Sequence, residues 1–148
     1  MSRFDKLKGH MFAPVTATVE AGRLRFFHKA IGETNPAVTC RGTGGRVPIP
    51  PTYLFCLEML DAENPFAFVD ELGVPITGIL HGEQAFTYHA PVHVGDRLHF
   101  QGRLADVVHK KGGALTLLVQ HVSVTNKDGA QVAEILRTLV LRNEALAA

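Results

Sequence analysis

The second half of the chain consists of long runs in which apolar and polar positions alternate. Residues 98, 100, 102 and 104 are Leu, Phe, Gly and Leu, whereas residues 97, 99, 101 and 103 are Arg, His, Gln and Arg. A period of two is typical of a strand with one face against a core. Such β-prone runs predict strands over residues 79–89, 96–109, 114–125 and 131–142. Because Lys-Lys-Gly-Gly at 110–113 and Asn-Lys-Asp-Gly at 126–129 are typical hairpin connections, we expect a four-stranded antiparallel meander.

The first half of the chain predicts a short strand and a helix before a long loop. Residues 1–13 are a polar lead-in that we expect to be poorly fixed, and residues 15–19 are a short β-prone run. Over residues 20–31, Leu24, Phe27 and Ile31 fall three and four apart, which predicts a helix with one apolar stripe that stops at Gly32. Residues 32–51 contain four glycines and four prolines and predict a loop of the length that is usually functional or mobile.

A second helix is predicted to begin at Pro50-Pro51 and to end at Asn64-Pro65. Its apolar residues occupy nearly all faces, which indicates a buried helix. They are Tyr53, Leu54, Phe55, Cys56, Leu57, Met59 and Leu60.

Together these elements predict one α+β domain over residues 14–148, with a curled antiparallel sheet wrapped around the central buried helix. A chain of 148 residues suits one such domain. Residues 115–119 are apolar at positions of both parities, which indicates that the second face of the sheet is also partly covered. We infer that the chain dimerises through its sheet.

Composition excludes several classes of function. The formal net charge is +1, so we expect no nucleic-acid partner. The N-terminus has no apolar signal segment and no run approaches the ~20 apolar residues of a membrane helix, so we expect a cytoplasmic protein with no membrane contact. Its two cysteines are expected to be reduced thiols. No metal is expected either, because the spacings of the eight histidines fit no zinc pattern.

Three segments carry a family resemblance: FFHKAIGETNP at 26–36, PPTYL at 50–54 and LHGEQAFTYHAPVHVGD at 80–96. They resemble the MaoC-like dehydratases, and in particular the N-terminal, non-catalytic half of double hot-dog members and the accessory subunits of (3R)-hydroxyacyl-thioester dehydratases. The resemblance implies a single hot-dog domain and an acyl thioester of CoA or acyl carrier protein as substrate. It implies no cofactor beyond the CoA or phosphopantetheine that the substrate carries.

The loop after the first helix departs from the catalytic relatives. Their loop reads Asp-x-Asn-Pro-x-His, and its Asp and His are the dyad that hydrates a 2-enoyl thioester. Here Glu33 stands in the place of the Asp and Val38 in the place of the His. Valine cannot transfer a proton, and the longer Glu33 side chain shifts its carboxylate. We therefore expect a hydratase or dehydratase component that works beside a catalytic hot-dog subunit, in a heterodimer or homodimer.

His81 is the residue of the third segment that could act with Glu33, and these two are the predicted catalytic residues. The alternative role of His81 is to fix the start of a strand by hydrogen bonding. Strand alternation places Gln84 on the face of Gly82 and not on that of His81, unless Gly82 marks a bulge.

Eight further residues are predicted to contact the substrate. Arg41 and Arg46 flank a glycine-rich stretch suited to the phosphates of CoA or of a phosphopantetheine carrier, or to a solvated loop. The other six are Asn35, Tyr53, Leu54, Leu57, Gly82 and Gln84.

Two alternative functions remain open on the sequence. Hot-dog thioesterases use a carboxylate on or near the central helix, and Glu58 lies in the middle of the predicted one. The chain could also be a non-enzymatic module that binds acyl-CoA without turnover.

Overall fold

The computed structural model describes residues 2–36, 38–39 and 46–143. Its elements in chain order are η1 (Asp5–Leu7), β1 (Val15–Thr18), α1 (Ala21–Ala30), α2 (Tyr53–Leu60), α3 (Ala67–Glu71), η2 (Ile76–Gly78), β2 (Ile79–Tyr88), β3 (Arg97–Lys110), η3 (Lys111–Gly113), β4 (Leu115–Asn126) and β5 (Gln131–Arg142). The first predicted helix and the four long strands agree with these bounds to within one residue at either end. The second helix ends earlier than predicted, at Leu60.

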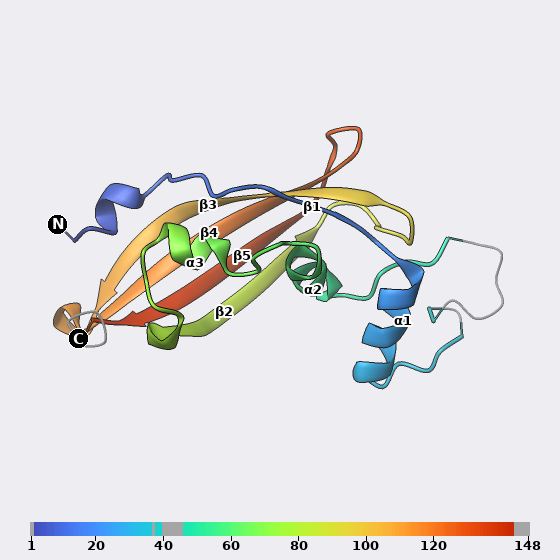
Figure 1. Cartoon of the computed structure of the whole chain (residues 1–148), viewed down its shortest axis with the longest axis horizontal. Coiled ribbons are helices and arrows are strands. Elements are labelled where there is room, and N and C mark those ends of the chain that lie inside the picture. Colours follow the sequence, from blue (N-terminus) through green and yellow to red (C-terminus); the bar gives the residue numbers. More distant parts are fainter. Residues whose placement is uncertain (1, 37, 40–45, 144–148) are drawn as a thin grey trace.

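The five strands form one curled antiparallel sheet in the order β1-β3-β4-β5-β2 (Figure 1). β3, β4 and β5 form a meander, but β2 pairs with β5 and not with β3. The predicted four-stranded meander is therefore wrong at its first strand. Residues 89–96 permit this crossing, because eight extended residues reach up to ~27 Å whereas the three strand spacings from β2 to β3 cover ~14 Å.

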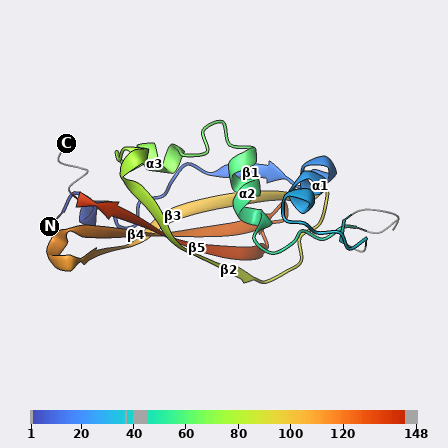
Figure 2. The ribbon, with the colours of Figure 1, turned by 90° about the horizontal axis from the view of Figure 1, so that it is seen from below.

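All three α-helices lie on the same side of the sheet (Figure 2). Three side chains of α2, Tyr53, Leu54 and Leu57, are 0% exposed and belong to the main hydrophobic core. Burial of side chains of this size stabilises the fold by ~1.5–3 kcal/mol each. The predicted α+β domain, with a curled sheet around a buried helix, is confirmed.

The inner face of β3 shows the predicted alternation. Leu98, Phe100 and Leu104 are at most 1% exposed, and the polar residues between them point outward. No described helix covers the outer face of the sheet, where Leu80 and Leu136 are 52% and 43% exposed. The described part of the chain therefore provides no element that covers the outer face of the sheet.

The N-terminal lead-in is fixed against the sheet, so the expectation of a poorly fixed segment is wrong. Phe4 and Phe12 are 3% and 4% exposed and pack with Leu104 in a second core cluster. The backbone N–H of Gly9 donates to Leu104 O at 2.8 Å, and that of Phe12 donates to Gly102 O at 2.9 Å. Two buried phenylalanines outweigh the polar composition of the segment.

The helix α3 was not predicted, because five residues are too few to show a helical period. Its Val69 is buried at 3% exposure, and Leu72 after it joins the second core cluster. Asn64 holds the turn before α3, since its Oδ1 accepts from Phe66 N at 3.0 Å and its Nδ2 donates to Asp70 at 2.7 Å. Within the described residues, no helix is both long enough and apolar enough to span a membrane.

Candidate functional site

Glu33 is positioned by the turn that ends α1. Gly32 has φ +73°, and the N–H groups of Gly32 and Glu33 donate to Lys29 O and His28 O at 3.2 and 2.9 Å. This is the Schellman pattern, in which the side chains three residues before and two residues after the helix end come together. The side chains of His28 and Glu33 are therefore neighbours. Glu33 Oε1 also accepts a hydrogen bond from Asn35 N at 2.8 Å.

A cavity of about 220 Å³ lies beside this turn. It is lined by Arg25, His28, Lys29, Glu33, Thr34 and Thr39. His28 is 2% exposed, and neither ring nitrogen has a hydrogen-bond partner within the part of the chain that the structure describes. Sequence reasoning missed His28, although it lies four residues after Leu24 on the buried side of the helix. The predicted stripe was wrong at Ile31, which is 52% exposed because α1 ends at Ala30.

The other predicted residues of this loop that the structure describes are not among those that line the cavity. Val38 donates its backbone N–H to Asn35 O at 3.1 Å and brings no titratable group. Arg41 lies outside the described residues. Arg46 forms an ion pair with Asp96, and its side chain is 65% exposed. Its contact with substrate phosphates stays a prediction.

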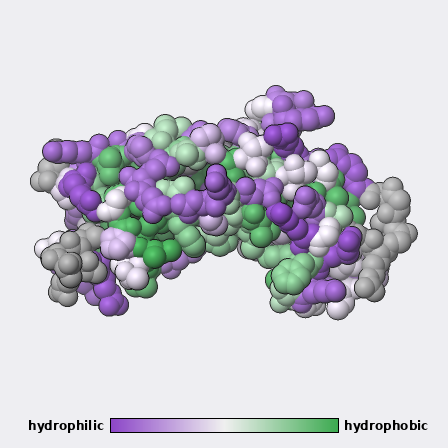
Figure 3. Space-filling model, in the orientation of Figure 1, coloured by the Kyte–Doolittle hydropathy of each residue, from purple (hydrophilic) through white to green (hydrophobic). Residues whose placement is uncertain are grey.

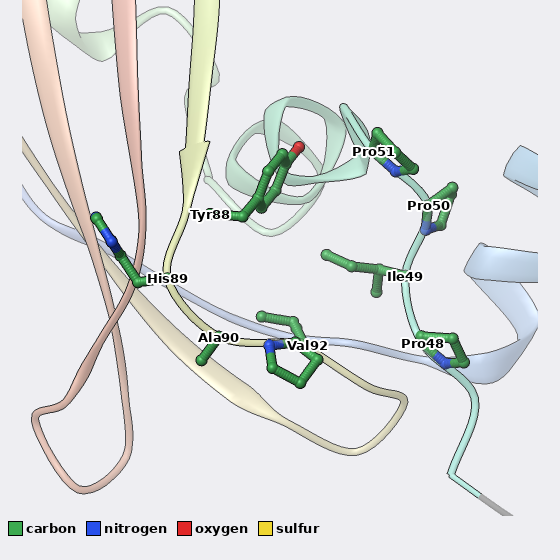
Figure 4. Close-up of a pocket in the computed structure, with 9 residues that line it drawn as sticks. Pro48, Ile49, Pro50, Pro51, Tyr88, His89, Ala90 and Val92 are labelled. Atoms are coloured by element: carbon green, nitrogen blue, oxygen red, sulfur yellow. The ribbon is translucent and has the colours of Figure 1, made fainter.

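A second cavity, of about 380 Å³, lies at the start of α2 (Figure 4). Its walls are formed by Pro48, Ile49, Pro50, Pro51, Tyr88, His89, Ala90, Pro91 and Val92. Tyr88 and Ile49 point toward each other across it, whereas His89 points away (Figure 4). The Tyr88 hydroxyl accepts from Thr52 N at 2.9 Å. That amide, which is one candidate to stabilise a thioester oxyanion, is therefore already bonded.

Three predicted substrate contacts on α2 are core residues. Tyr53, Leu54 and Leu57 are fully buried and line none of the cavities described here. The Tyr53 hydroxyl has no hydrogen-bond partner within residues 2–36, 38–39 and 46–143, and burial raises the pKa of this phenol. Contact of these three side chains with substrate stays a prediction.

Gly82 marks a bulge in β2. The pairing with β5 shifts between His81, opposite Leu139, and Glu83, opposite Thr138. A Cβ on Gly82 would lie 2.8 Å from Val140 Cγ2. A regular strand would place His81 and Gln84 on opposite faces unless Gly82 marked a bulge. Because the bulge is present, both side chains lie on the same face, toward the helices.

His81 lies on the wall of a third cavity, of about 180 Å³, which we call the distal pocket. The pocket lies between α2, α3 and the start of β2, and its lining residues are Phe55, Met59, Phe66, Phe68, Val69, Ile76, Ile79, His81, Arg137 and Leu139. The His81 ring stacks on Phe55 with centroids 5.5 Å apart. His81 is exposed, and its ring nitrogens have no hydrogen-bond partner in the part of the chain that the structure describes.

Arg137 on β5 and Glu58 on α2 form a buried ion pair behind the distal pocket. Arg137 is 2% exposed and donates from Nη2 to Glu58 Oε2 at 2.5 Å and from Nη1 to Gln120 Oε1 at 3.1 Å. Because its charge is matched by Arg137 and its side chain is only 14% exposed, Glu58 is poorly placed as a nucleophile. This ion pair argues against Glu58 as the thioesterase carboxylate, and the thioesterase alternative stays a prediction.

Within this chain, Glu33 and His81 are not brought together. They line different cavities, and the end of α1 and the start of β2 lie on opposite sides of α2 (Figure 1). Their catalytic roles stay predictions, but one copy of the described chain does not assemble them around one water.

Two histidines on the outer face of the sheet hydrogen-bond to the carboxylate of Glu134. His89 and His121 hydrogen-bond to the two oxygens of Glu134 at 2.7 and 2.9 Å, and these contacts lower the pKa of Glu134. Among the described residues, no group of three or more His, Cys, Asp or Glu side chains is arranged to hold a metal ion.

The comparisons with known proteins agree with this architecture. The family described as FAS1-like, dehydratase domain region, matches residues 6–135. A UPF0336 protein of Saccharopolyspora erythraea is 30% identical over 140 residues, which cover 89% of this chain and 87% of that protein.

Two solved structures share the fold. One is the HadBC (3R-hydroxyacyl-ACP dehydratase) complex from Mycobacterium tuberculosis, with a TM-score of 0.71, 24% identity and coverage of 90% of this chain and 96% of that chain. The other is a MaoC-like dehydratase from Phytophthora capsici, with a TM-score of 0.75, 23% identity and coverage of 96% of this chain and 49% of that chain. The chain therefore belongs to the family of FAS1-like dehydratase domain regions and has a single hot-dog fold, which it shares with these dehydratase structures.

Proposed function

We propose that this chain is the substrate-binding subunit of an acyl-thioester hydratase or dehydratase and acts beside a hot-dog partner that supplies the catalytic dyad. The observation that carries the proposal is Val38, which stands where catalytic relatives have a histidine. The fold and the family membership support the class of substrate, an acyl thioester of CoA or acyl carrier protein.

The chemistry explains why one carboxylate is insufficient. In hydration, the water oxygen bonds to C3 of the enoyl thioester, one water proton is removed, and C2 gains a proton. Glu33 offers one carboxylate, which already accepts a hydrogen bond from Asn35 N. A partner that contributes Asp and His completes the proton transfers without any cofactor beyond the CoA or phosphopantetheine of the substrate.

The two largest cavities described above suit the head of such a substrate. Arg25 and Lys29 line the cavity of Glu33 and are exposed cations that suit phosphates. The cavity between Tyr88 and Pro50 is apolar and lies at the start of α2. From there, the inner face of β2 leads past Phe86 and Gln84 to His81, roughly 20 Å away at the usual rise of a strand. We assign this path to the acyl chain.

The free edge of β2 is the proposed contact with the partner. β2 is the outermost strand on its side of the sheet, and no described strand pairs with its other edge. Most of its ten residues are exposed. An uncovered strand of this length is a template for pairing with another sheet. The HadBC structure is a complex of hot-dog subunits, which supports a partner of the same fold.

Hydration of crotonyl-CoA tests the proposal. The protein is assayed alone and together with a hot-dog protein that carries Asp-x-Asn-Pro-x-His, which is to be sought in the neighbouring reading frames. We expect no turnover by the isolated protein, and turnover by the complex above that of the partner alone.

Three variants make the outcome interpretable. Robust turnover by the isolated protein that is lost in Glu33→Ala, but kept in the control Glu63→Ala, overturns the proposal. Binding of acyl-CoA without turnover in any combination overturns it in favour of a non-enzymatic module. Release of free CoA that is lost in Glu58→Gln overturns it in favour of a thioesterase.

A further inference from the structure

The distal pocket has an apolar wall that suits a hydrocarbon chain. Eight of its lining residues are aromatic or aliphatic, and Phe66 and Ile76 at its rim are 42% and 52% exposed. Figure 3 shows hydrophobic side chains at the surface where η2 and the start of β2 lie, at the lower left. A free acyl chain gains about 0.8 kcal/mol per CH₂ group that it buries in such a place.

Polar groups in this apolar region are left without partners. Arg137 Nε and both amide atoms of Gln84 are buried and have no hydrogen-bond partner in the described chain. Gln84 lies opposite Arg137 in the β2–β5 pairing, so the three atoms belong to one place on the inner face. An unsatisfied buried donor or acceptor costs ~1–3 kcal/mol, which a ligand atom can recover.

The Phe55 side chain connects these groups to the pocket. Its ring stacks on His81, and Arg137 Cζ lies 5.4 Å from the same ring centroid. Arg137 and His81 both line the pocket. His81 and Arg137 therefore both lie against the same ring on the pocket wall.

The charges around the distal pocket favour a neutral ligand atom over a charged one. Glu58 already neutralises Arg137 at 2.5 Å, and the described residues of the pocket wall include no other lysine or arginine. A carboxylate would enter as an unmatched negative charge in an apolar environment, which is costly. A neutral oxygen accepts from Arg137 Nε and from His81 without that penalty.

We propose that the distal pocket binds the far part of an acyl chain that carries a neutral oxygen, either a hydroxyl or a ketone. His81 and Arg137 are then the residues that select oxygenated chains. This inference rests on the proposed function, because it takes the acyl thioester as the ligand and names a class of acyl group.

Binding of matched thioesters tests the inference. The probes are dodecanoyl-CoA and hexadecanoyl-CoA, each in plain, ω-hydroxylated and ω-carboxylated form, titrated calorimetrically into the full-length protein alone and with its catalytic partner. At one of the two lengths we expect the hydroxylated probe to bind about tenfold more tightly than the plain one, the effect of roughly one buried hydrogen bond. The carboxylated probe is expected to bind no more tightly than the plain one.

Variants identify the residues responsible. His81→Phe keeps a ring against Phe55 and is expected to abolish the preference, whereas His99→Phe, on the outer face, is expected to keep it. The double variant Arg137→Met/Glu58→Gln removes the guanidinium without leaving a buried charge alone and is expected to weaken the preference.

The outcomes separate this inference from the proposed function. Equal binding of plain and hydroxylated probes, or tightest binding of the carboxylated probe, overturns the inference alone. A preference that survives His81→Phe and the double variant also overturns it. Failure of every thioester to bind, alone and with the partner, overturns the proposed function and the inference together.

Discussion

At the scale of single residues, the notable feature of this protein is a set of polar groups buried around α2 without partners. Those in the described chain are both ring nitrogens of His28, the Tyr53 hydroxyl, the Gln84 amide and Arg137 Nε. Folded proteins leave few such groups unsatisfied. Arg137 lines the distal pocket and lies opposite Gln84 in the sheet, and His28 lines the cavity of Glu33, so most of these groups border the proposed substrate path.

His28→Leu tests whether the buried histidine contributes to stability. Leucine is similar in size and removes two unsatisfied polar atoms, so we expect the free energy of unfolding in urea to stay the same or to rise by up to ~2 kcal/mol. His109→Leu is the control, because His109 hydrogen-bonds to Thr116 and Asp5 at 3.1 Å, and we expect a loss there. A loss in His28→Leu as large as that of the control would contradict this view.

At the scale of elements, the bulge in β2 decides which side chains face the helices. With a regular strand, His81 and Gln84 would lie on opposite faces, and only one of them would face the helices. The bulge requires glycine, since a Cβ on Gly82 would lie 2.8 Å from Val140 Cγ2 and 3.3 Å from Thr138 O. One residue without a side chain therefore sets the composition of a pocket wall.

Gly82→Ala is expected to destabilise the fold by ~1–3 kcal/mol, because the added methyl group overpacks against β5. Gly22→Ala in α1 is the matched control. Its Cβ would have only Arg25 Nη2 nearby, at 3.8 Å, and alanine favours helix, so stability should be unchanged or higher by up to ~1 kcal/mol. Urea denaturation measures both, and equal stabilities of Gly82→Ala and the wild type would refute the tight bulge.

At the scale of the whole molecule, the chain has its helices on one side of the sheet and an open edge at β2 (Figures 1 and 2). The edge strand carries exposed Leu80, which lies opposite Val140 on the outer face. A lone domain with such an edge tends to associate. The proposed hot-dog partner would cover it.

Leu80→Lys/Ala85→Lys tests this surface. Both positions are exposed on β2, and lysines on an edge strand oppose pairing because their charge must be desolvated there. We expect the dissociation constant of the complex, measured by analytical ultracentrifugation, to rise at least ~10-fold while the melting temperature of the monomer stays within a few degrees. Thr16→Lys on β1, at the other edge, should leave the dissociation constant unchanged. If the double variant binds its partner like the wild type, the contact lies elsewhere.

How well the sequence predicted the candidate site differs from one part of the site to the next. The turn at Gly32 and Glu33 was predictable, because a glycine after an amphipathic helix is a strong local signal. His28 was overlooked because the sequence does not show whether a histidine on an apolar stripe of a helix is buried. The sequence allowed a bulge at Gly82 but did not predict one, since strand alternation alone does not reveal an extra residue.

By itself the sequence determined the α+β class and the ranges of the first helix and the four long strands, because these depend on local periodicity. The tertiary structure decided that β2 joins β5, that the lead-in packs through Phe4 and Phe12, and that Glu33 and His81 lie apart. It also brought Arg137 and His81 to one pocket from separate strands and placed Glu58 of α2 against Arg137. Such contacts join residues far apart in the chain, and their energy depends on packing and burial that no local pattern encodes.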